Sequence, residues 1–474
     1  MAADNPNSLA RDARQAAAAP DDADGRTDAA EGCAVAAEPL ISDDALAALF
    51  APLTAFDAVV LAVSGGGDSM ALMHLAARWR QQCGKRSPNI IVATVDHGLR
   101  AESRREAEWV VQQARDLDLE AHLLSWIGDK PATGIQDAAR RERYRLLGEL
   151  ANSLPERGRV AVVTAHTADD QAETLLMRLA RGSGIDGLAG MAPERPLDAA
   201  AADGVMLVRP LLSISGASLR ATLQARGIGW IDDPSNAVER FERVRIRKAA
   251  RLLAEMGFSN DRLAVSVRRI ARARAALLEA QKELAARARL DLHRGAYASF
   301  DLTIWRQAPE ELRLRMLGDL IGRFGGSAVP VSLASLEDLT RRASAVGFEG
   351  ATLGGAIVTP QGDELRIWRE DGRGLPVLTL QPGETAIWDG RFRVRADITS
   401  PSLVEVRALG RPALANLRRM EGWPDTMQAA PAATLPAIWR GDELVAVPFF
   451  ADWLKNDKGH FGREIELYSA EFLA

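Results

Sequence analysis

Short apolar runs alternate with longer amphipathic stretches from about Leu46 to Asp233. The apolar runs are short enough to be strands and lie at 59–63, 90–95, 121–124 and 160–164. Between them, apolar residues recur at the spacing of helices that cover a core. Strands separated by helices indicate a parallel sheet with both faces covered. The pattern therefore predicts an α/β fold for this part of the chain.

The pattern changes after this region. Helical character predominates from Arg240 to about Leu290 and returns at 309–324 and 332–345, while short alternating runs such as 356–358 and 365–368 predict strands beyond Gly350. Residues 1–45 are rich in Ala and Asp and show no apolar period, which predicts disorder. We expect four parts: an acidic tail (1–45), the α/β domain (46–240), a helical arginine-rich domain (241–350) and a small α+β region (351–474).

Charge is distributed unevenly over a chain whose formal net charge is −5. The segment from Arg240 to Arg274 holds eleven bases against three acids. A solvated amphipathic helix would explain part of this, but such a one-sided excess favours contact with a nucleic-acid backbone. Our candidates in this segment for binding the nucleic acid are Arg243, Arg245, Arg247 and Lys248.

Composition also excludes several classes of protein. No apolar stretch approaches the roughly 20 residues of a membrane-spanning helix, and no signal peptide is apparent, so we expect a cytoplasmic protein without membrane contact. Cys33 and Cys83 are the only cysteines and form no C-x-x-C pair. A disulfide framework or a cysteine-ligated metal centre is therefore not supported.

A glycine-rich loop follows the first predicted strand and precedes a helical segment. Its sequence is Ser64, Gly65, Gly66, Gly67, Asp68 and Ser69. Amide N–H groups of such a loop can close on an anion at a helix start, where the helix dipole also favours negative charge. A simple turn capped by Asp68 or Ser69 is the alternative, but the strand–loop–helix context predicts a site for the phosphates of a nucleotide.

Further candidate residues follow other predicted strands, where parallel sheets bind ligands. The segment 166–174 opens a predicted helix, and its spacing should bring His166, Asp170 and Glu173 together on one face. This cluster could take a proton from an amine, and Asp169 is our candidate for Mg²⁺ held with the nucleotide phosphates, although helix capping is an alternative role. Asp96 ends another strand, and Arg140 and Arg143 offer cations to phosphate.

Taken together, these motifs resemble the bacterial tRNA(Ile)-lysidine synthetase family of the PP-loop ATP pyrophosphatase superfamily. The resemblance covers 46 to about 250 and rests on the order and spacing of SGGGDS (64–69), DHGLR (96–100), RRERY (140–144), HTADDQAET (166–174), RGSGIDGLAGM (181–191), RPLL (209–212) and DDPSN (232–236). It implies an adenine nucleotide alpha hydrolase-like fold for the N-terminal domain. The segment 435–448 is similar to the small final domain of the family.

The resemblance implies an ATP-dependent ligase acting on an isoleucine tRNA with a CAU anticodon. ATP would adenylate the C2 oxygen of the wobble cytidine, and the ε-amine of free L-lysine would then displace AMP to give lysidine. Glycine amides of the loop would hold the ATP phosphates, and Asp96, Asp170 and Glu173 are the candidates for positioning and deprotonating the lysine. Arg140 and Arg143 would stabilise the reacting phosphate or hold tRNA. A second copy of the chain is kept among the candidate partners.

Three other functions share some of these features. A tRNA thiolase uses the same adenylation but usually needs more cysteines than this chain offers. A small-molecule amidating synthetase would need an ammonia source and no arginine-rich segment. An RNA-binding protein on a degenerate scaffold would not need the acids and glycines that are present.

Overall fold

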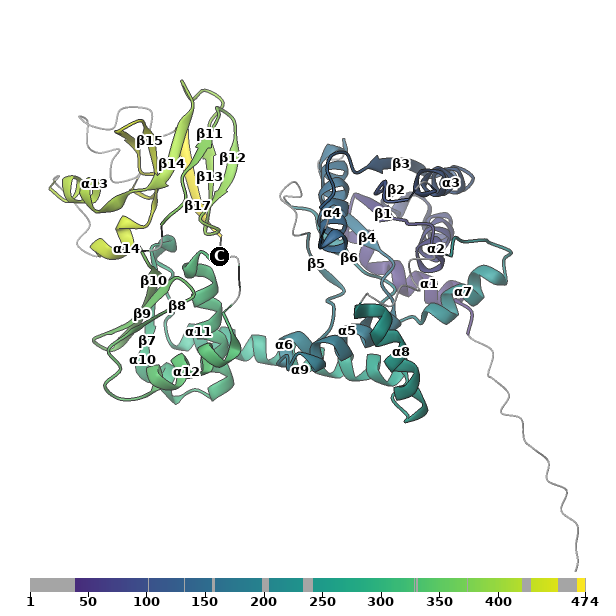
Figure 1. The fold of residues 1–474 in the computed structure, drawn as a ribbon, viewed down its shortest axis with the longest axis horizontal. Helices are drawn as coiled ribbons and strands as arrows, with labels where there is room; N and C mark the ends of the chain where they lie inside the picture. The colour runs from purple at the N-terminus through teal and green to yellow at the C-terminus, as the bar shows by residue number, and fades with distance from the viewer. Residues whose placement is uncertain are drawn as a thin grey trace, which may run out of the picture. The chain divides into compact units, whose positions relative to one another are not determined.

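The computed structural model describes residues 39–100, 102–131, 133–155, 158–197, 204–232, 242–327, 329, 331–372, 374–419, 428–450 and 467–473. Nearly all of the acidic tail (1–45) lies outside the described residues. The chain divides into two compact units: one extends to Thr167 and includes Arg195–Asp233, and the other comprises Ala168–Glu194 and the chain from Pro234 onward. Each unit is coloured along the chain in Figure 1.

The first unit is built on a six-stranded sheet of order β3-β2-β1-β4-β6-β5. Its strands are β1 (Ala58–Ala62), β2 (Asn89–Asp96), β3 (Glu120–Ser125), β4 (Val160–Thr164), β5 (Glu194–Pro196) and β6 (Met206–Val208). Its helices are α1 (Asp43–Phe50), α2 (Gly67–Cys83), α3 (Ser103–Arg115), α4 (Ile135–Ser153) and α7 (Gly216–Gln224). The pairs β1–β2, β2–β3, β1–β4 and β4–β6 are parallel, which confirms the predicted α/β class.

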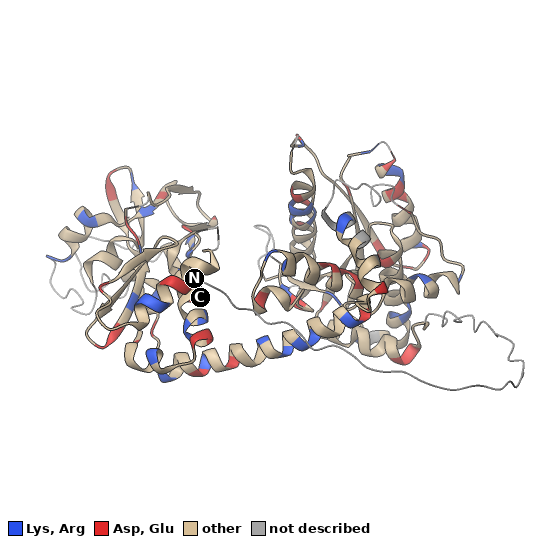
Figure 2. Ribbon diagram, turned by 60° about the horizontal axis from the view of Figure 1, so that its bottom comes forward, with Lys and Arg blue, Asp and Glu red and all other residues tan. Residues whose placement is uncertain are grey.

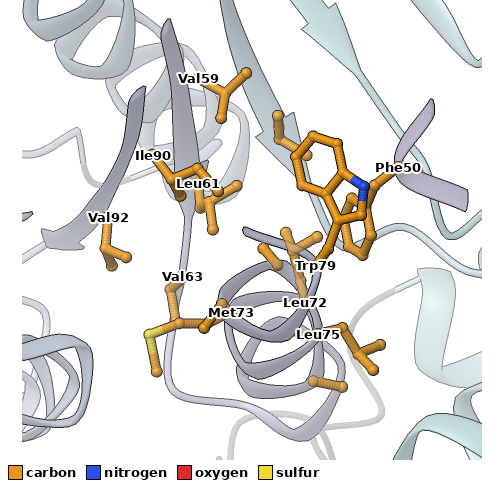
Figure 3. Packing of buried hydrophobic residues seen from close by; sticks show 14 of the residues in the cluster. Phe50, Val59, Leu61, Val63, Leu72, Met73, Leu75, Trp79, Ile90 and Val92 are labelled. Atoms are coloured by element: carbon orange, nitrogen blue, oxygen red, sulfur yellow. The ribbon is translucent and has the colours of Figure 1, made fainter. Parts of the chain in front are cut away.

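Both faces of this sheet are buried. Val59 and Leu61 of β1 face a core that includes α2, where Phe50 stacks on Trp79 with ring centroids 5.5 Å apart (Figure 3). Ala58 and Val60 face the opposite core, which includes Leu147 of α4. This alternation is the reason that β1 reads as an uninterrupted apolar run in the sequence.

The second unit begins with helices. They are α5 (Ala168–Ala180), α6 (Ile185–Leu188), α8 (Glu242–Glu255) and α9 (Asn260–Arg287), followed by α10 (Leu302–Gln307), α11 (Glu310–Gly325) and α12 (Leu333–Ser344). The arginine-rich segment is thus two helices separated by a turn that contains Gly257 (φ +90°). Blue segments recur along the long helix α9 in Figure 2, which marks its lysines and arginines.

Three sheets complete the second unit. The first has the order β7-β10-β9-β8 and contains β7 (Tyr297–Asp301), β8 (Ala351–Leu353), β9 (Ala356–Gln361) and β10 (Glu364–Arg369). The second has the order β11-β14-β15-β16 and contains β11 (Leu378–Leu380), β14 (Val404–Ala408), β15 (Pro436–Arg440) and β16 (Glu443–Ala446). The third has the order β12-β13-β17 and contains β12 (Thr385–Trp388), β13 (Phe392–Ala396) and β17 (Tyr468–Phe472). Helices α13 (Gly410–Leu417) and α14 (Ala429–Ala433) accompany them.

The first of these sheets differs from the sequence-based expectation of a helical segment before residue 350. Strand β7 lies within that segment, yet it pairs with β10 in an antiparallel register that sets Phe300 opposite Leu365. The signal for β7 is weak in the sequence because the strand is only five residues long and its partner lies more than sixty residues away.

A buried ion-pair cluster ties this sheet to the C-terminal strands. Asp389 accepts from Arg369 Nε at 2.9 Å and from Arg391 Nε at 2.7 Å. All three side chains are at most 7% exposed, and Arg391 also donates to the carbonyl of Thr434. Burial lowers the pKa of Arg391 to about 10, and the negative charge of Asp389 opposes this shift by stabilising the buried cation.

We predict that Asp389→Asn destabilises the second unit. Asparagine tolerates the positive φ of this position (+51°), so the change removes charge while keeping the shape. Two buried guanidinium groups would lose their counter-ion, a loss of about 3 kcal/mol or more. Urea unfolding followed by fluorescence should show this, whereas Asp371→Asn, which breaks an exposed pair with Arg411, should change stability by less than about 1 kcal/mol.

Candidate active site

The glycine-rich loop lies where the sequence places it, between β1 and α2. Gly65 has φ +89°, and its carbonyl accepts from the amide of Ile231 at 2.9 Å. A Cβ at this position would lie 2.8 Å from Ile231 Cδ1, so both the backbone conformation and the close approach require glycine. The chain around Trp230 and Ile231 therefore supports the loop from behind, a contact that no local sequence signal indicates.

Serine hydroxyls hold the shape of the loop. Ser69 Oγ donates to the carbonyl of Gly66 at 2.8 Å and accepts from the amide of Ser64 at 3.1 Å. Ser69 is buried, whereas Ser64 is exposed. Ser69 thus fixes the turn, and Ser64 is the loop hydroxyl that can reach a ligand. The first amides of α2 have no intrahelical acceptor, as at any helix start, and this makes the loop suited to an anion.

Asp68 occupies the first turn of α2, where its carboxylate lies 3.7 Å from the guanidinium of Arg220. Arg220 belongs to α7, and its Cγ is the nearest atom to a Cβ built on Gly67, at 3.3 Å. Sequence analysis did not identify Arg220, because its approach to the loop depends on how α7 packs on α2. Arg220 adds a cation beside a loop that is built for phosphate.

Asp96 ends the neighbouring strand, β2, and His97 follows it at the same edge of the sheet. Asp96 Oδ1 accepts from the amide of Gly98 at 2.8 Å and from Ser103 Oγ at 2.6 Å. Desolvation opposes ionisation of Asp96, but these hydrogen bonds, with Arg104 and Lys130, lower its pKa below the ordinary value. Asp96 is therefore ionised at neutral pH and is a weak proton acceptor.

His97 was not among the predicted site residues, although it stands next to Asp96 in the DHGLR motif. Its Nε2 lies 3.4 Å from a guanidinium nitrogen of Arg143, which can only donate. Burial, and then the charge of Arg143, lower the pKa of His97 to about 4. Among the described residues, the buried Nδ1 has no hydrogen-bond partner. A neutral ring with its proton on Nδ1 would offer that donor to a ligand.

Arg140 and Arg143 lie on α4, as predicted. The guanidinium of Arg140 lies over the ring of Tyr144, 5.0 Å from its centroid. His166 stands at the carboxyl end of β4, where its Nδ1 is 2.8 Å from Thr164 Oγ1. The first unit thus brings the loop, Asp96, Arg143 and His166 to one edge of its sheet.

One sequence-based expectation is wrong. His166 does not share a helix face with the acids, because α5 begins at Ala168 and His166 precedes it. Asp169, Asp170 and Glu173 lie on α5, in the second unit. Glu173 is buried (5% exposed) and Asp170 is half-buried, one turn before it.

A preformed Mg²⁺ site is not present in the described part of the chain. No group of three or more His, Cys, Asp or Glu side chains that could hold a metal is found there. Asp169, the predicted ligand, has Oδ1 engaged by Asn260 Nδ2 at 2.8 Å. The donor set therefore does not fit a resident metal.

The predicted tRNA-binding residues Arg243, Arg245, Arg247 and Lys248 all lie on α8, where Arg245 is exposed. The side chains of the other three lie outside the described residues, as does the DDPSN motif beyond Asp232. No helix in the described residues is both long and apolar enough to cross a membrane.

Residues 40–253 match the family model of the PP-loop domain. A relative named tRNA(Ile)-lysidine synthase from Ruegeria pomeroyi is 43% identical over 396 residues, covering 82% of this chain and 87% of that protein. Relatives of the same name from a Bradyrhizobium species and from Brucella anthropi are 46% and 35% identical; the matches cover 67% and 87% of this chain and 92% and 90% of those proteins. The chain belongs to the tRNA(Ile)-lysidine synthase family.

The solved structure of a U34-tRNA thiolase from Methanococcus maripaludis is a distant likeness. It is 15% identical and covers 49% of this chain and 77% of that chain, with a TM-score of 0.37. A likeness this low does not favour a thiolase.

We predict that His97 remains neutral well below pH 6. An ordinary histidine titrates near pH 6.5, whereas burial and Arg143 move the midpoint of His97 to about pH 4. Histidine ring signals in NMR, assigned with His97→Gln, should show the neutral form at pH 5. The unfolded chain takes up this proton near pH 6.5, whereas the folded chain does so only near pH 4. The free energy of unfolding should therefore fall as the pH is lowered from about 6.5 toward 4. A midpoint near 6.5 would contradict the assignment.

Proposed function

We propose that this chain ligates free L-lysine to C2 of the wobble cytidine in an isoleucine tRNA with a CAU anticodon. ATP adenylates the C2 oxygen and pyrophosphate leaves; the ε-amine of lysine then attacks C2, loses a proton and expels AMP. The product, lysidine, pairs with A rather than G. Membership of the tRNA(Ile)-lysidine synthase family carries this proposal, and the geometry of the glycine-rich loop supports its ATP step.

The loop and α2 would bind the ATP phosphates. Loop amides and Ser64 would donate to phosphate oxygens, while Asp68 and Arg220 would orient the triphosphate. Arg143 would stabilise the negative charge that builds on the α-phosphate, or hold a tRNA phosphate together with Arg140. Mg²⁺ would accompany ATP, and no step is assigned to a metal that the protein holds.

Lysine must lose a proton before it attacks, because its free amine has a pKa near 10.4. Asp96 is a weak base, since two hydrogen bonds already stabilise its ionised form. We therefore assign proton acceptance to Asp170 or Glu173 and a positioning role to Asp96. His166 would contact the substrate as a neighbour of the loop. Cytoplasmic location and a homodimer stay predictions.

The first experiment measures AMP and pyrophosphate release by the purified chain, with and without lysine and a CAU-anticodon isoleucine tRNA. Radiolabelled lysine should enter the wobble cytidine only when ATP and tRNA are both present. Sulfur incorporation would instead indicate a thiolase, dependence on glutamine or ammonia an amidating synthetase, and RNA binding without ATP turnover a non-catalytic protein. Any of these outcomes would overturn the proposal.

We predict that Asp68→Ala abolishes pyrophosphate release and leaves tRNA binding nearly intact. The loss follows because the carboxylate sits in the first turn of α2, beside the proposed phosphates, and far from the arginines of α8 in sequence. Filter binding of tRNA and pyrophosphate release measure the two effects. Asp116→Ala, at an exposed end of α3, is the control and should keep full activity. Full activity of Asp68→Ala would contradict the role of the loop.

A further inference from the structure

Helix α5 is fastened to α9 along much of its length. Asn260, the first residue of α9, donates from Nδ2 to Asp169 Oδ1 at 2.8 Å. One turn further along, Ala172 and Leu175 pack against Leu263 and Val267 in a small apolar cluster. The helices lie side by side in Figure 1. The hydrogen bond between Asn260 and Asp169 and the apolar cluster next to it together fix how α5 is rotated and where it lies along α9.

The motif RGSGIDGLAGM (181–191) is a second fastening, to which the proposed reaction gives no role. Gln171 of α5 pairs with Met191 in both directions: its Nε2 donates to the carbonyl at 2.9 Å, and its Oε1 accepts from the amide at 2.7 Å. Gly190 has φ +70°, and a Cβ there would lie 2.5 Å from Gln171 Oε1 and 2.6 Å from Val267 Cγ1. The motif is therefore wedged between α5 and α9, and only glycine fits at its closest point.

The same motif is anchored beyond α5. Asp186 accepts from Arg274 Nε of α9 at 2.7 Å and from Arg315 Nη1 of α11 at 2.8 Å. Arg315 is 7% exposed and is also held by Glu311 at 2.8 Å. Burial works against ionisation of Asp186, but the two arginines lower its pKa below the ordinary value. The short helix α6, which carries Asp186, is thus tied to two other helices of the second unit.

From these contacts we infer that Asn260 is a positioning residue of the ligation reaction, which acts by holding Asp169 and with it the carboxylates of Asp170 and Glu173. Asp169 then serves as the anchor of α5 rather than as a metal ligand. The 181–191 motif, through Met191 and Gln171, holds the same first turn of the helix from another side, and Asp186 ties the motif itself to α9 and α11. This inference rests on the proposed function, since it assigns the acids of α5 to the chemistry.

The test is a swap of the two polar partners. Asn260→Ala should lower kcat for lysine transfer about tenfold while KM for ATP changes less than about twofold, because a small misplacement of the acids affects the chemical step alone. The double variant Asp169→Asn with Asn260→Asp rebuilds the hydrogen bond with its groups exchanged and keeps the net charge. It should recover most of the lost kcat relative to Asp169→Asn.

Two controls separate positioning from general damage. Asp261→Ala truncates the next residue of the same exposed helix turn and should leave kcat unchanged. Hydrogen–deuterium exchange of 168–180 should quicken in Asn260→Ala and in Asp186→Asn, and should return to the wild-type rate in the swap. Equal kcat for Asn260→Ala and Asp261→Ala would overturn the inference. So would a swap that regains ordered α5 but no activity, because the carboxylate of Asp169 would then itself be required.

Failure of the proposed function gives a different result. In that case the wild-type chain transfers no lysine, while the exchange measurement still reports on the fastening of α5. Unchanged exchange in Asn260→Ala would overturn the inference whatever the reaction is.

Discussion

Burial of β1 on both faces is the constraint on which the nucleotide site depends. Val59 and Leu61 fill one core while Ala58 and Val60 fill the other, so the strand has no freedom to shift without moving its whole apolar set. The chain must then leave the sheet at the carboxyl edge, where Gly65 turns back on Ile231. Asp96 and His166 reach the same edge because β2 and β4 flank β1 in parallel register.

Much of this arrangement could be predicted from sequence because its signals are local. The apolar runs predicted strands β1 to β4 to within one residue, and the glycine-rich loop indicated the start of α2; the short strands β5 and β6 were not predicted. The position of His166 could not be predicted in the same way. Residue spacing alone placed His166 on the same helix as the acids, whereas in the structure it precedes α5 and contacts Thr164. The prediction assumed that the helix begins at the first residue of the 166–174 motif, but α5 begins two residues later.

Other parts depend on contacts between residues far apart in the chain, which carry no local signal. Arg220 meets the loop only because α7 packs on α2, and β7 becomes a strand only through β10. Asp389 looks like an ordinary turn residue in the sequence, yet it neutralises two buried arginines. No sequence pattern around Asn260 indicates its hydrogen bond to Asp169. In all four cases the contact depends on how distant segments pack, and no residue spacing in the sequence predicts it.

Because α5 belongs to the second unit, the contacts of α5 with α9 and with the 181–191 motif bear on the position of its acids. The acids follow β4 in sequence, as the family motif suggests, but Gln171, Asp169 and Ala172 are committed to α9 and to the motif after α5. The exposed Arg268, Arg269 and Arg272 lie on that same long helix. An RNA backbone bound along α9 would therefore contact a helix that packs directly against α5, which carries Asp170 and Glu173. Under the proposed function, phosphate binding and the placement of these carboxylates would depend on the same pair of packed helices.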